Sequence, residues 1–209
     1  MAAKRGITLY HSPASRAFVA YWMLEELGVP FDVRTVDIRK GEQKAPWYLK
    51  LNPAGKVPTL TDGEAVVSEN PAIAIYLADR YSYGGLAPRI EDPKRGAYLK
   101  WMVFASAVVD PVASLHASDI DLPGYSHSFG TFDDMVQVLI GALDGREHLL
   151  GEAFSAADVV LGGAVSFLMF RKVLPEHPAL VDYNHRLTAR DAYQRAADAT
   201  WPPDLFQRG

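Results

Sequence analysis

The first part of the chain, residues 1–83, combines short apolar runs with one amphipathic stretch, a pattern typical of a mixed α/β domain. Ile7 to Tyr10 has the length and hydrophobicity of a buried strand. Apolar residues then recur at helical spacing from Ala14 to Leu27. Residues 31–38 alternate loosely between polar and apolar types, as an edge strand does. The chain is therefore expected to begin with a strand, a helix and a second strand.

A proline interrupts the next strand pattern. Residues 57–60 and 65–67 are mostly apolar and flank an Asp-Gly pair, which predicts a hairpin with a tight turn. Pro58 has no amide hydrogen to donate to a neighbouring strand. It therefore marks either an edge strand or a cis peptide bond at a functional bend.

Three positions carry the signals of a helix start. Ser12 and Asn70 each precede a proline, so each fits an N-cap with proline at the first helical position. Ser155 to Asp158 resembles a capping box, with an acid at the third helical position. The stretch that follows, Val159 to Phe170, is apolar almost all round, so we expect it to form the buried centre of a helical bundle.

The second part of the chain shows helical periods and no convincing strand. The only connector rich in glycine and proline lies just before it, which predicts a first domain of residues 1–83, a linker of residues 84–92 and an all-helical domain of residues 93–209. Pro111 is expected to kink the first helix of that domain, because proline cannot donate the helical hydrogen bond.

Composition and charge narrow the function classes. The chain has 209 residues, 49% of them hydrophobic, which suffices for well-filled cores. Lys and Arg number 21 against 25 acidic residues, giving a net charge of −4. That balance predicts no broad basic face for nucleic acid or an anionic membrane. No signal-peptide pattern and no run of about 18 apolar residues occurs, so we expect a cytoplasmic protein.

The chain has no cysteine. This excludes disulfides, thiolate metal sites and any mechanism in which the protein supplies its own thiol. The six histidines show no metal-binding spacing, and no phosphate-binding glycine motif appears, so we expect no metal and no bound cofactor.

Several motifs in a fixed order resemble the glutathione transferase family over residues 7–199. Ser12 to Arg16 is similar to the serine-and-arginine turn of its serine-type classes, such as theta, phi and delta. Asn52 to Leu60 resembles the loop before the family's cis-proline, and Glu69-Asn70 falls where an acid and a serine are usual. Residues 151–158 and 186–196 resemble its C-terminal signatures. The resemblance implies a thioredoxin-like domain with a mixed four-stranded sheet, followed by a helical bundle, in a homodimer.

The resemblance also implies residue roles. Glutathione is the co-substrate, and a small electrophile the second substrate. Ser12 would donate a hydrogen bond to the glutathione thiolate, while Ser15 is the competing donor and Tyr10 a packed strand residue. The implied contacts of glutathione are Gln43, Lys44, Lys56, Val57, Pro58, Glu69 and Asn70. Trp101, Phe104 and Val108 share one helix face that either lines the second-substrate pocket or belongs to the core.

Three kinds of function fit these motifs. The first is conjugation of the glutathione thiolate to an electrophile, with the protein supplying orientation and a lowered thiol pKa. The second is another glutathione-dependent reaction, namely isomerisation, dehalogenation or disulfide reduction. The third is a glutathione-binding relative without turnover. Classes that use a protein cysteine are excluded.

Overall fold

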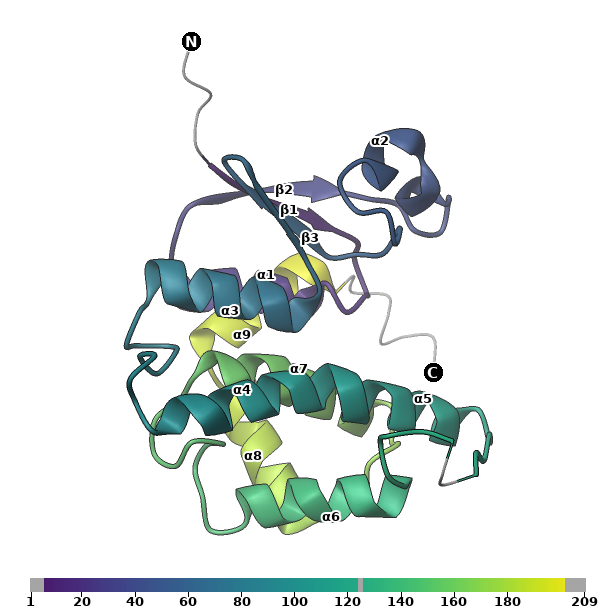
Figure 1. Cartoon of the computed structure of the whole chain (residues 1–209), viewed down its shortest axis with the longest axis vertical. Helices are drawn as coiled ribbons and strands as arrows, with labels where there is room; N and C mark the ends of the chain where they lie inside the picture. The colour runs from purple at the N-terminus through teal and green to yellow at the C-terminus, as the bar shows by residue number, and fades with distance from the viewer. Residues whose placement is uncertain (1–5, 124–125, 202–209) are drawn as a thin grey trace. The chain divides into compact units, whose positions relative to one another are not determined.

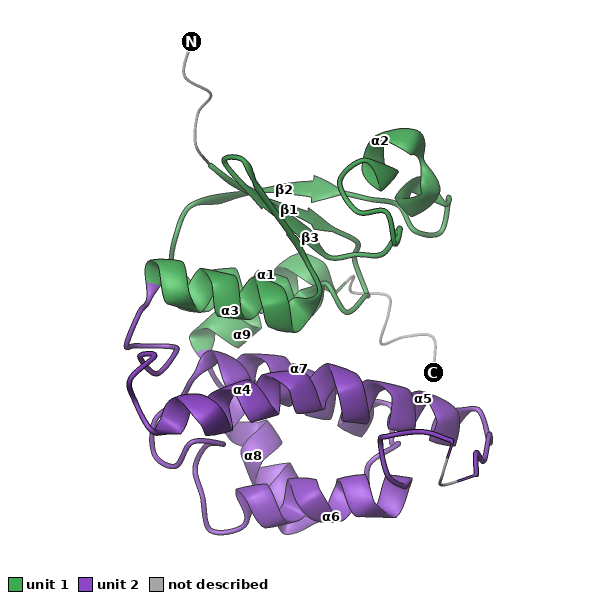
Figure 2. Cartoon of the chain, viewed as in Figure 1, with its two compact units in different colours: residues 1–81, 191–209 green, residues 82–190 purple. Residues whose placement is uncertain are grey.

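The computed structural model describes residues 6–123 and 126–201 (Figure 1). It divides into two compact units (Figure 2). Unit 1 consists of residues 1–81 and 191–209, and unit 2 of residues 82–190. The predicted domains, 1–83 and 93–209, extend to the first and last residues of the chain. Residues 1–5 and 202–209 of these domains lie outside the described residues.

Unit 1 is built around one mixed sheet of four strands, as expected. Its elements are β1 (Ile7–His11), α1 (Phe18–Leu27), β2 (Phe31–Thr35), the 3-10 turn η1 (Glu42–Lys44), α2 (Pro46–Leu49), β3 (Thr59–Asp62), β4 (Ala65–Ser68), α3 (Asn70–Tyr81) and α9 (Asp191–Thr200). The strand order is β2-β1-β3-β4, with β1 and β2 parallel and the other two pairs antiparallel.

The two faces of the sheet are covered by different helices. Alternate residues of β1, Ile7 and Leu9, are buried on one face, as the period of a strand requires. Figure 1 shows α1 and α3 together on that side of the sheet. Tyr10 lies on the other face, where its ring contacts the rings of Trp47 and Tyr48 from α2. The prediction that Tyr10 is a packed strand residue is therefore confirmed.

The first helix begins later than the sequence predicts. Residues 13–17 form turns, α1 starts at Phe18, and its N-cap position is Ala17, which makes no side-chain capping bond. The prediction that Ser12 caps this helix is therefore wrong. Ala14 adopts a positive φ of 54°, which takes the chain out of the helical path at this point. The predicted end of the helix is confirmed, because Gly28 closes it with φ 63° and donates its amide to Leu24 O.

Helix α9 packs in unit 1, although the expected boundary placed it in the helical domain. The ring of Tyr193 lies 5.0 Å from both Phe18 and Trp22 of α1. Arg195 adds an ion pair with Glu25, with Nε 2.7 Å from the carboxylate oxygen. The face of α9 that carries Tyr193 thus packs against α1, a partner that periodicity alone does not identify.

The regular elements of unit 2 within its described residues are helices, joined by turns and loops. Its helices are α4 (Lys94–Phe104), α5 (Asp110–Ala117), α6 (Phe132–Leu143), α7 (Ala156–Phe170) and α8 (Pro178–Thr188). As predicted, α7 is buried on nearly every side, from Ala156 to Leu168. Helix α6 lies between Pro111 and Ser155, where no element was predicted from the sequence.

The predicted kink at Pro111 appears as a change of helix type. A π-helical turn, η2 (Ala105–Val109), separates α4 from α5. Proline lacks the amide hydrogen for a regular helical bond, and a π turn accommodates the missing donor. The whole run Lys94–Ala117 has a mean hydropathy of 1.2 over an 18-residue window that is 39% buried. Length and hydropathy of this order suit a membrane span, and the core helix of a globular protein has them as well.

A buried carboxylate fixes the start of α7. Asp158 is fully buried and accepts hydrogen bonds from Leu149 N, Ser155 N and Ser155 Oγ, at 2.9, 2.9 and 3.0 Å. The Tyr183 hydroxyl of α8 donates a fourth, at 3.0 Å. The predicted capping box is therefore confirmed, and it also ties two helices and a loop together. Burial raises the pKa of the Asp158 carboxyl, against the opposing effect of these hydrogen bonds.

We expect Asp158→Ala to lower the free energy of unfolding by about 2–4 kcal/mol, because it removes a cap and leaves buried donors without an acceptor. Urea unfolding followed by circular dichroism measures this. The matched control is Asp134→Ala, which removes the same kind of cap from α6 at an exposed position. Water replaces the lost contacts there, so the loss should be clearly smaller. Equal losses in the two variants would contradict the network.

Candidate functional site

Strand register brings three chain segments to one end of the sheet of unit 1. Tyr10 pairs with Thr59 across β1 and β3, and Thr59 pairs with Ser68 across β3 and β4. Both pairings are antiparallel, so the residues after β1, before β3 and after β4 all lie at this end. The register thus gathers five of the predicted site residues, namely Ser12, Val57, Pro58, Glu69 and Asn70.

The peptide bond between Val57 and Pro58 is cis, as predicted. Pro58 is buried and Val57 is half-buried directly before β3. Thr59 is the first residue of β3 that pairs with β1, so the backbone groups of Val57 lie beyond the last rung of the ladder.

The turn between β1 and α1 carries two serines in different situations. The Ser15 hydroxyl donates to Ser12 O at 2.6 Å, and its oxygen accepts from Ala17 N at 3.2 Å. Ser15 is therefore used inside the turn. Ser12 is 4% exposed, and no group in the described part of the chain bonds to its hydroxyl.

The turn is linked to α3 and α9 by two long-range hydrogen bonds. Asn70 Nδ2 donates to Arg16 O at 2.9 Å. Ala14 N donates to Thr200 O, at the end of α9, at 3.1 Å. Within the described residues, the other side-chain atom of Asn70, Oδ1, is buried without a partner.

Helix α3 begins at Asn70 itself, so the prediction of Asn70 as the cap before the helix is wrong by one position. Glu69 precedes the helix and is exposed, with φ 69°. Its backbone oxygen accepts from Ile73 N at 2.9 Å, as an N-cap residue's does. The Glu69 carboxylate therefore stands at the start of α3, beside the turn that holds Ser12.

A polar network holds the loop before Pro58, and sequence reasoning missed it. Tyr48 Oη and Asn52 Nδ2 donate to Lys56 O at 2.6 and 3.0 Å. The same two groups lie 2.9 and 3.2 Å from Thr59 Oγ1. The available sequence signal was a tyrosine and an asparagine shortly before the cis-proline, and Asn52 proves to be 3% exposed.

Two of the three predicted donors near this loop are brought to it by η1. Lys44 Nζ donates to Ala54 O at 2.9 Å. Gly55 has φ 61°, and a Cβ there would come within 2.8 Å of the backbone oxygen of Gln43, so only glycine fits. Gln43 is half-buried, and within the described residues its Oε1 has no partner. Lys56 is exposed, and the network above uses its carbonyl oxygen.

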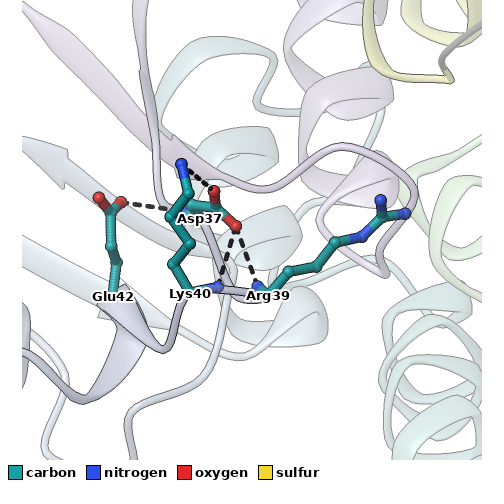
Figure 3. Close-up of polar contacts among 4 residues, drawn as sticks. All are labelled: Asp37, Arg39, Lys40 and Glu42. Carbon is teal, nitrogen blue, oxygen red and sulfur yellow. Dashed lines mark hydrogen bonds and ion pairs between the residues drawn. The ribbon is translucent and has the colours of Figure 1, made fainter.

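The approach to η1 is held by a compact set of polar contacts (Figure 3). Asp37 Oδ1 accepts from Arg39 N and Lys40 N at 3.0 and 3.2 Å, and Lys40 Nζ pairs with Asp37 Oδ2 at 3.1 Å. Glu42 Oε2 accepts from Asp37 N at 2.8 Å. The side-chain hydrogen bond from Lys40 is the main cause that lowers the pKa of Asp37. These contacts fix the backbone of residues 37–42, directly before Gln43 and Lys44.

His11 lies directly before Ser12 and faces the core. It is 3% exposed, and its ring centroid lies 5.8 Å from that of Tyr21 on α1. Among the described residues its Nε2 atom has no hydrogen-bond partner. Burial lowers the pKa of His11 from 6.5 to about 4, so the side chain is neutral at pH 7.

The candidates for the second-substrate pocket lie on the helices of unit 2. Trp101 is 6% exposed, and its ring contacts that of Phe104 at 5.5 Å. Trp101 is thus a core residue of this unit, while Phe104 and Val108 are half-buried. Val108 belongs to the π turn. Among residues 6–123 and 126–201, no group of three or more acidic or histidine side chains has the arrangement of a metal site.

Comparison with known proteins gives one consistent family. Residues 5–79 match the family model described as the glutathione S-transferase N-terminal domain. Glutathione S-transferase F10 of Arabidopsis thaliana is 31% identical over 166 residues, covering 73% of this chain and 76% of that protein. A glutathione S-transferase of Hyoscyamus muticus is 28% identical, covering 90% and 94%.

Solved structures agree. The theta class glutathione S-transferase of Xanthomonas axonopodis pv. citri, solved with glutathione bound, is 30% identical with a TM-score of 0.74. The match covers 92% of this chain and 97% of that one. The predicted fold class, a thioredoxin-like domain followed by a helical domain, is confirmed.

The pH dependence of stability tests the neutral state of His11. Between pH 6.5 and about 4 the unfolded chain binds a proton that the folded chain does not, so stability is lost as pH falls through this window. The loss attributable to His11 at pH 4 should be about 3 kcal/mol. His11→Phe keeps a ring against Tyr21 and cannot titrate, so it should lose this component. Urea unfolding at pH 7, 5.5 and 4 compares the two proteins, and an identical pH dependence would refute the burial of a neutral imidazole.

Proposed function

The chain belongs to the glutathione S-transferase family, and we propose that it conjugates the glutathione thiolate to small, mostly apolar electrophiles, with Ser12 as its catalytic residue. The observation that carries the choice of Ser12 is the contrast between the two serines of the turn. The Ser15 hydroxyl is already donated to Ser12 O, whereas no described group bonds to the Ser12 hydroxyl.

The chemistry requires only a positioned hydrogen bond. A free thiol has a pKa of about 8.5 and is mostly protonated at neutral pH. A hydroxyl that donates to the thiolate stabilises the ionised form and lowers this pKa. The glutathione sulfur then forms a bond to the electrophilic carbon, and the leaving group departs with the electron pair of the bond that breaks. The chain contains no cysteine, so all the sulfur chemistry belongs to glutathione.

The ligand's charges match the site from end to end. Glutathione carries an ammonium and a carboxylate at its γ-glutamyl end, and a carboxylate at its glycyl end. We assign the ammonium to the exposed carboxylate of Glu69, and the adjacent carboxylate to the backbone amide of Asn70 at the start of α3. The backbone of Val57, beside Pro58, would pair with the cysteinyl residue.

The glycyl carboxylate would meet Gln43, Lys44 and Lys56. Lys44 donates one hydrogen bond to Ala54 O, and an ammonium has two further hydrogens to offer. Lys56 is exposed and adds a second positive charge. The two lysines and Glu69 thus offer opposite charges to the two ends of one ligand, which supports glutathione over a singly charged thiol.

The remaining assignments follow from the family. Phe104 and Val108 are half-buried and suit contact with an apolar second substrate, and Trp101 would support them from the core. We also propose that the protein is a cytoplasmic homodimer that needs no cofactor and uses glutathione as a co-substrate. Light scattering coupled to size exclusion measures the oligomeric state directly.

We expect Ser12→Ala to raise the pKa of bound glutathione and to lower turnover at neutral pH about tenfold or more, because a hydrogen bond to the thiolate is lost. Glutathione affinity should change little. Ultraviolet absorbance of the thiolate, titrated with pH, gives the pKa, and a chromogenic aryl chloride reports turnover. Ser15→Ala leaves the Ser12 hydroxyl in place and should keep most of the activity. A loss confined to Ser15→Ala would transfer the role to Ser15.

We expect Glu69→Gln to weaken glutathione binding about tenfold to a hundredfold, because a charge-assisted contact to the ammonium is lost while the shape of the side chain is kept. Isothermal titration calorimetry measures the affinity. Glu64→Gln removes the same charge from the exposed β3–β4 turn, at the opposite end of the hairpin, and should bind glutathione normally. If both variants lost affinity alike, a general charge effect would explain the result and Glu69 would leave the site.

A further inference from the structure

The turn that presents Ser12 is held by local hydrogen bonds and by groups far away in the sequence. Its residues precede α1, and the helix gives it no side-chain cap. Ala14 holds a positive φ of 54°, a conformation that residues other than glycine rarely adopt without support. The local bonds are those of the Ser15 hydroxyl with Ser12 O and Ala17 N, and two backbone bonds into the turn, from Phe18 N to Ser15 O and from Val19 N to Arg16 O. The direction of the Ser12 hydroxyl therefore depends on what fixes the two ends of this turn.

At the start of the turn, Val36 N donates to His11 O at 2.7 Å, and two further long-range hydrogen bonds reach the turn itself. One is a backbone bond, from Ala14 N to Thr200 O. The other comes from a side chain, with Asn70 Nδ2 donating to Arg16 O across 54 positions of sequence. The second bond is the one that a single substitution removes without changing the backbone.

The chemistry of the partner fixes which atom of Asn70 does this. A backbone oxygen only accepts hydrogen bonds, so the NH2 group must face Arg16, and Oδ1 faces away. Within the described residues, Oδ1 has no partner, which leaves Nδ2 as the atom that makes the contact. A serine at this position carries its hydroxyl one bond closer to the backbone and would not span the same gap.

We propose that Asn70 is a positioning residue, which acts through Arg16 O to hold the Ser12 turn in the geometry that ionises the thiol. Its neighbour Glu69 meets the γ-glutamyl end of glutathione in the proposed function, on which this inference rests. The start of α3 thus couples the place where glutathione is held to the place where its sulfur is activated. A residue that only bound the ligand would affect affinity, whereas Asn70 should affect thiol ionisation.

The test is Asn70→Ser in the full chain. Serine has at least the helix propensity of asparagine at a position inside the first turn, so the fold should be kept. We expect the pKa of the bound glutathione thiol to rise by about 0.5–1 unit, while glutathione affinity changes less than about threefold. Thiolate absorbance titrated with pH gives the first quantity and calorimetry the second. A wild-type thiol pKa in Asn70→Ser would overturn the proposal.

The double variant Ser12→Ala with Asn70→Ser decides whether Asn70 acts through Ser12. If it does, the Asn70 substitution causes no further rise once the hydroxyl is gone. An undiminished rise in the Ser12→Ala background would overturn the proposal. If Asn70→Ser does not fold, Asn70→Asp takes its place in the same cycle, because it keeps the shape and loses the donor. Any direct effect of its added charge persists without Ser12, and the positioning effect does not.

The wild-type measurement separates this inference from the function it rests on. A chain that fails to bind glutathione, or that binds it without lowering the thiol pKa, refutes the proposed function before any variant is made. A chain that binds and ionises glutathione, and does so equally well as Asn70→Ser, refutes only the role of Asn70.

Discussion

The candidate site depends on the register of β3. Thr59, its first residue, pairs with Tyr10 on one side and with Ser68 on the other. The three segments that carry Ser12, Val57 and Glu69 therefore lie at the same end of the sheet. Side chains alternate along a strand, and a slip of one residue would reverse every side chain of β3. Thr59 also holds the loop before it, because its hydroxyl contacts Tyr48 and Asn52. One buried threonine thus fixes both this end of the sheet and the loop that contains the cis-proline.

Around this register the structure relies on contacts between distant parts of the chain. Asn70 of α3 and Thr200 of α9 both bond to the turn after β1, and α9 joins unit 1 through its aromatic contacts with α1. The end of the chain therefore contributes to the unit in which the chain begins. A serine hydroxyl has free rotation about one bond and a weak intrinsic preference for direction, so these backbone restraints determine what it meets.

Local sequence signals predicted many of the elements and failed where partners are distant. The hairpin around Asp62-Gly63, the end of α1 at Gly28 and the capping box at Asp158 each follow from residues close in sequence, and the structure has them. Capping by Ser12 was predicted from the proline that follows it, but Ala14 and its bond to Thr200 redirect the turn. The placement of α9 and the contacts of Tyr48 and Asn52 require knowledge of the folded register, which no local window of sequence contains.

Because the chain has no cysteine, the proposed reaction depends on how the turn that carries Ser12 is held. A protein that supplies its own thiolate can tolerate loose binding of a partner, because the nucleophile is anchored to the chain. In the proposed function the nucleophile arrives with the ligand, so its ionisation would depend on how well glutathione and one hydroxyl are held relative to each other. Small displacements of a hydrogen-bond donor weaken its effect on a pKa steeply. Selection for activity would therefore act on the residues that hold the turn, such as Asn70, as well as on Ser12 itself.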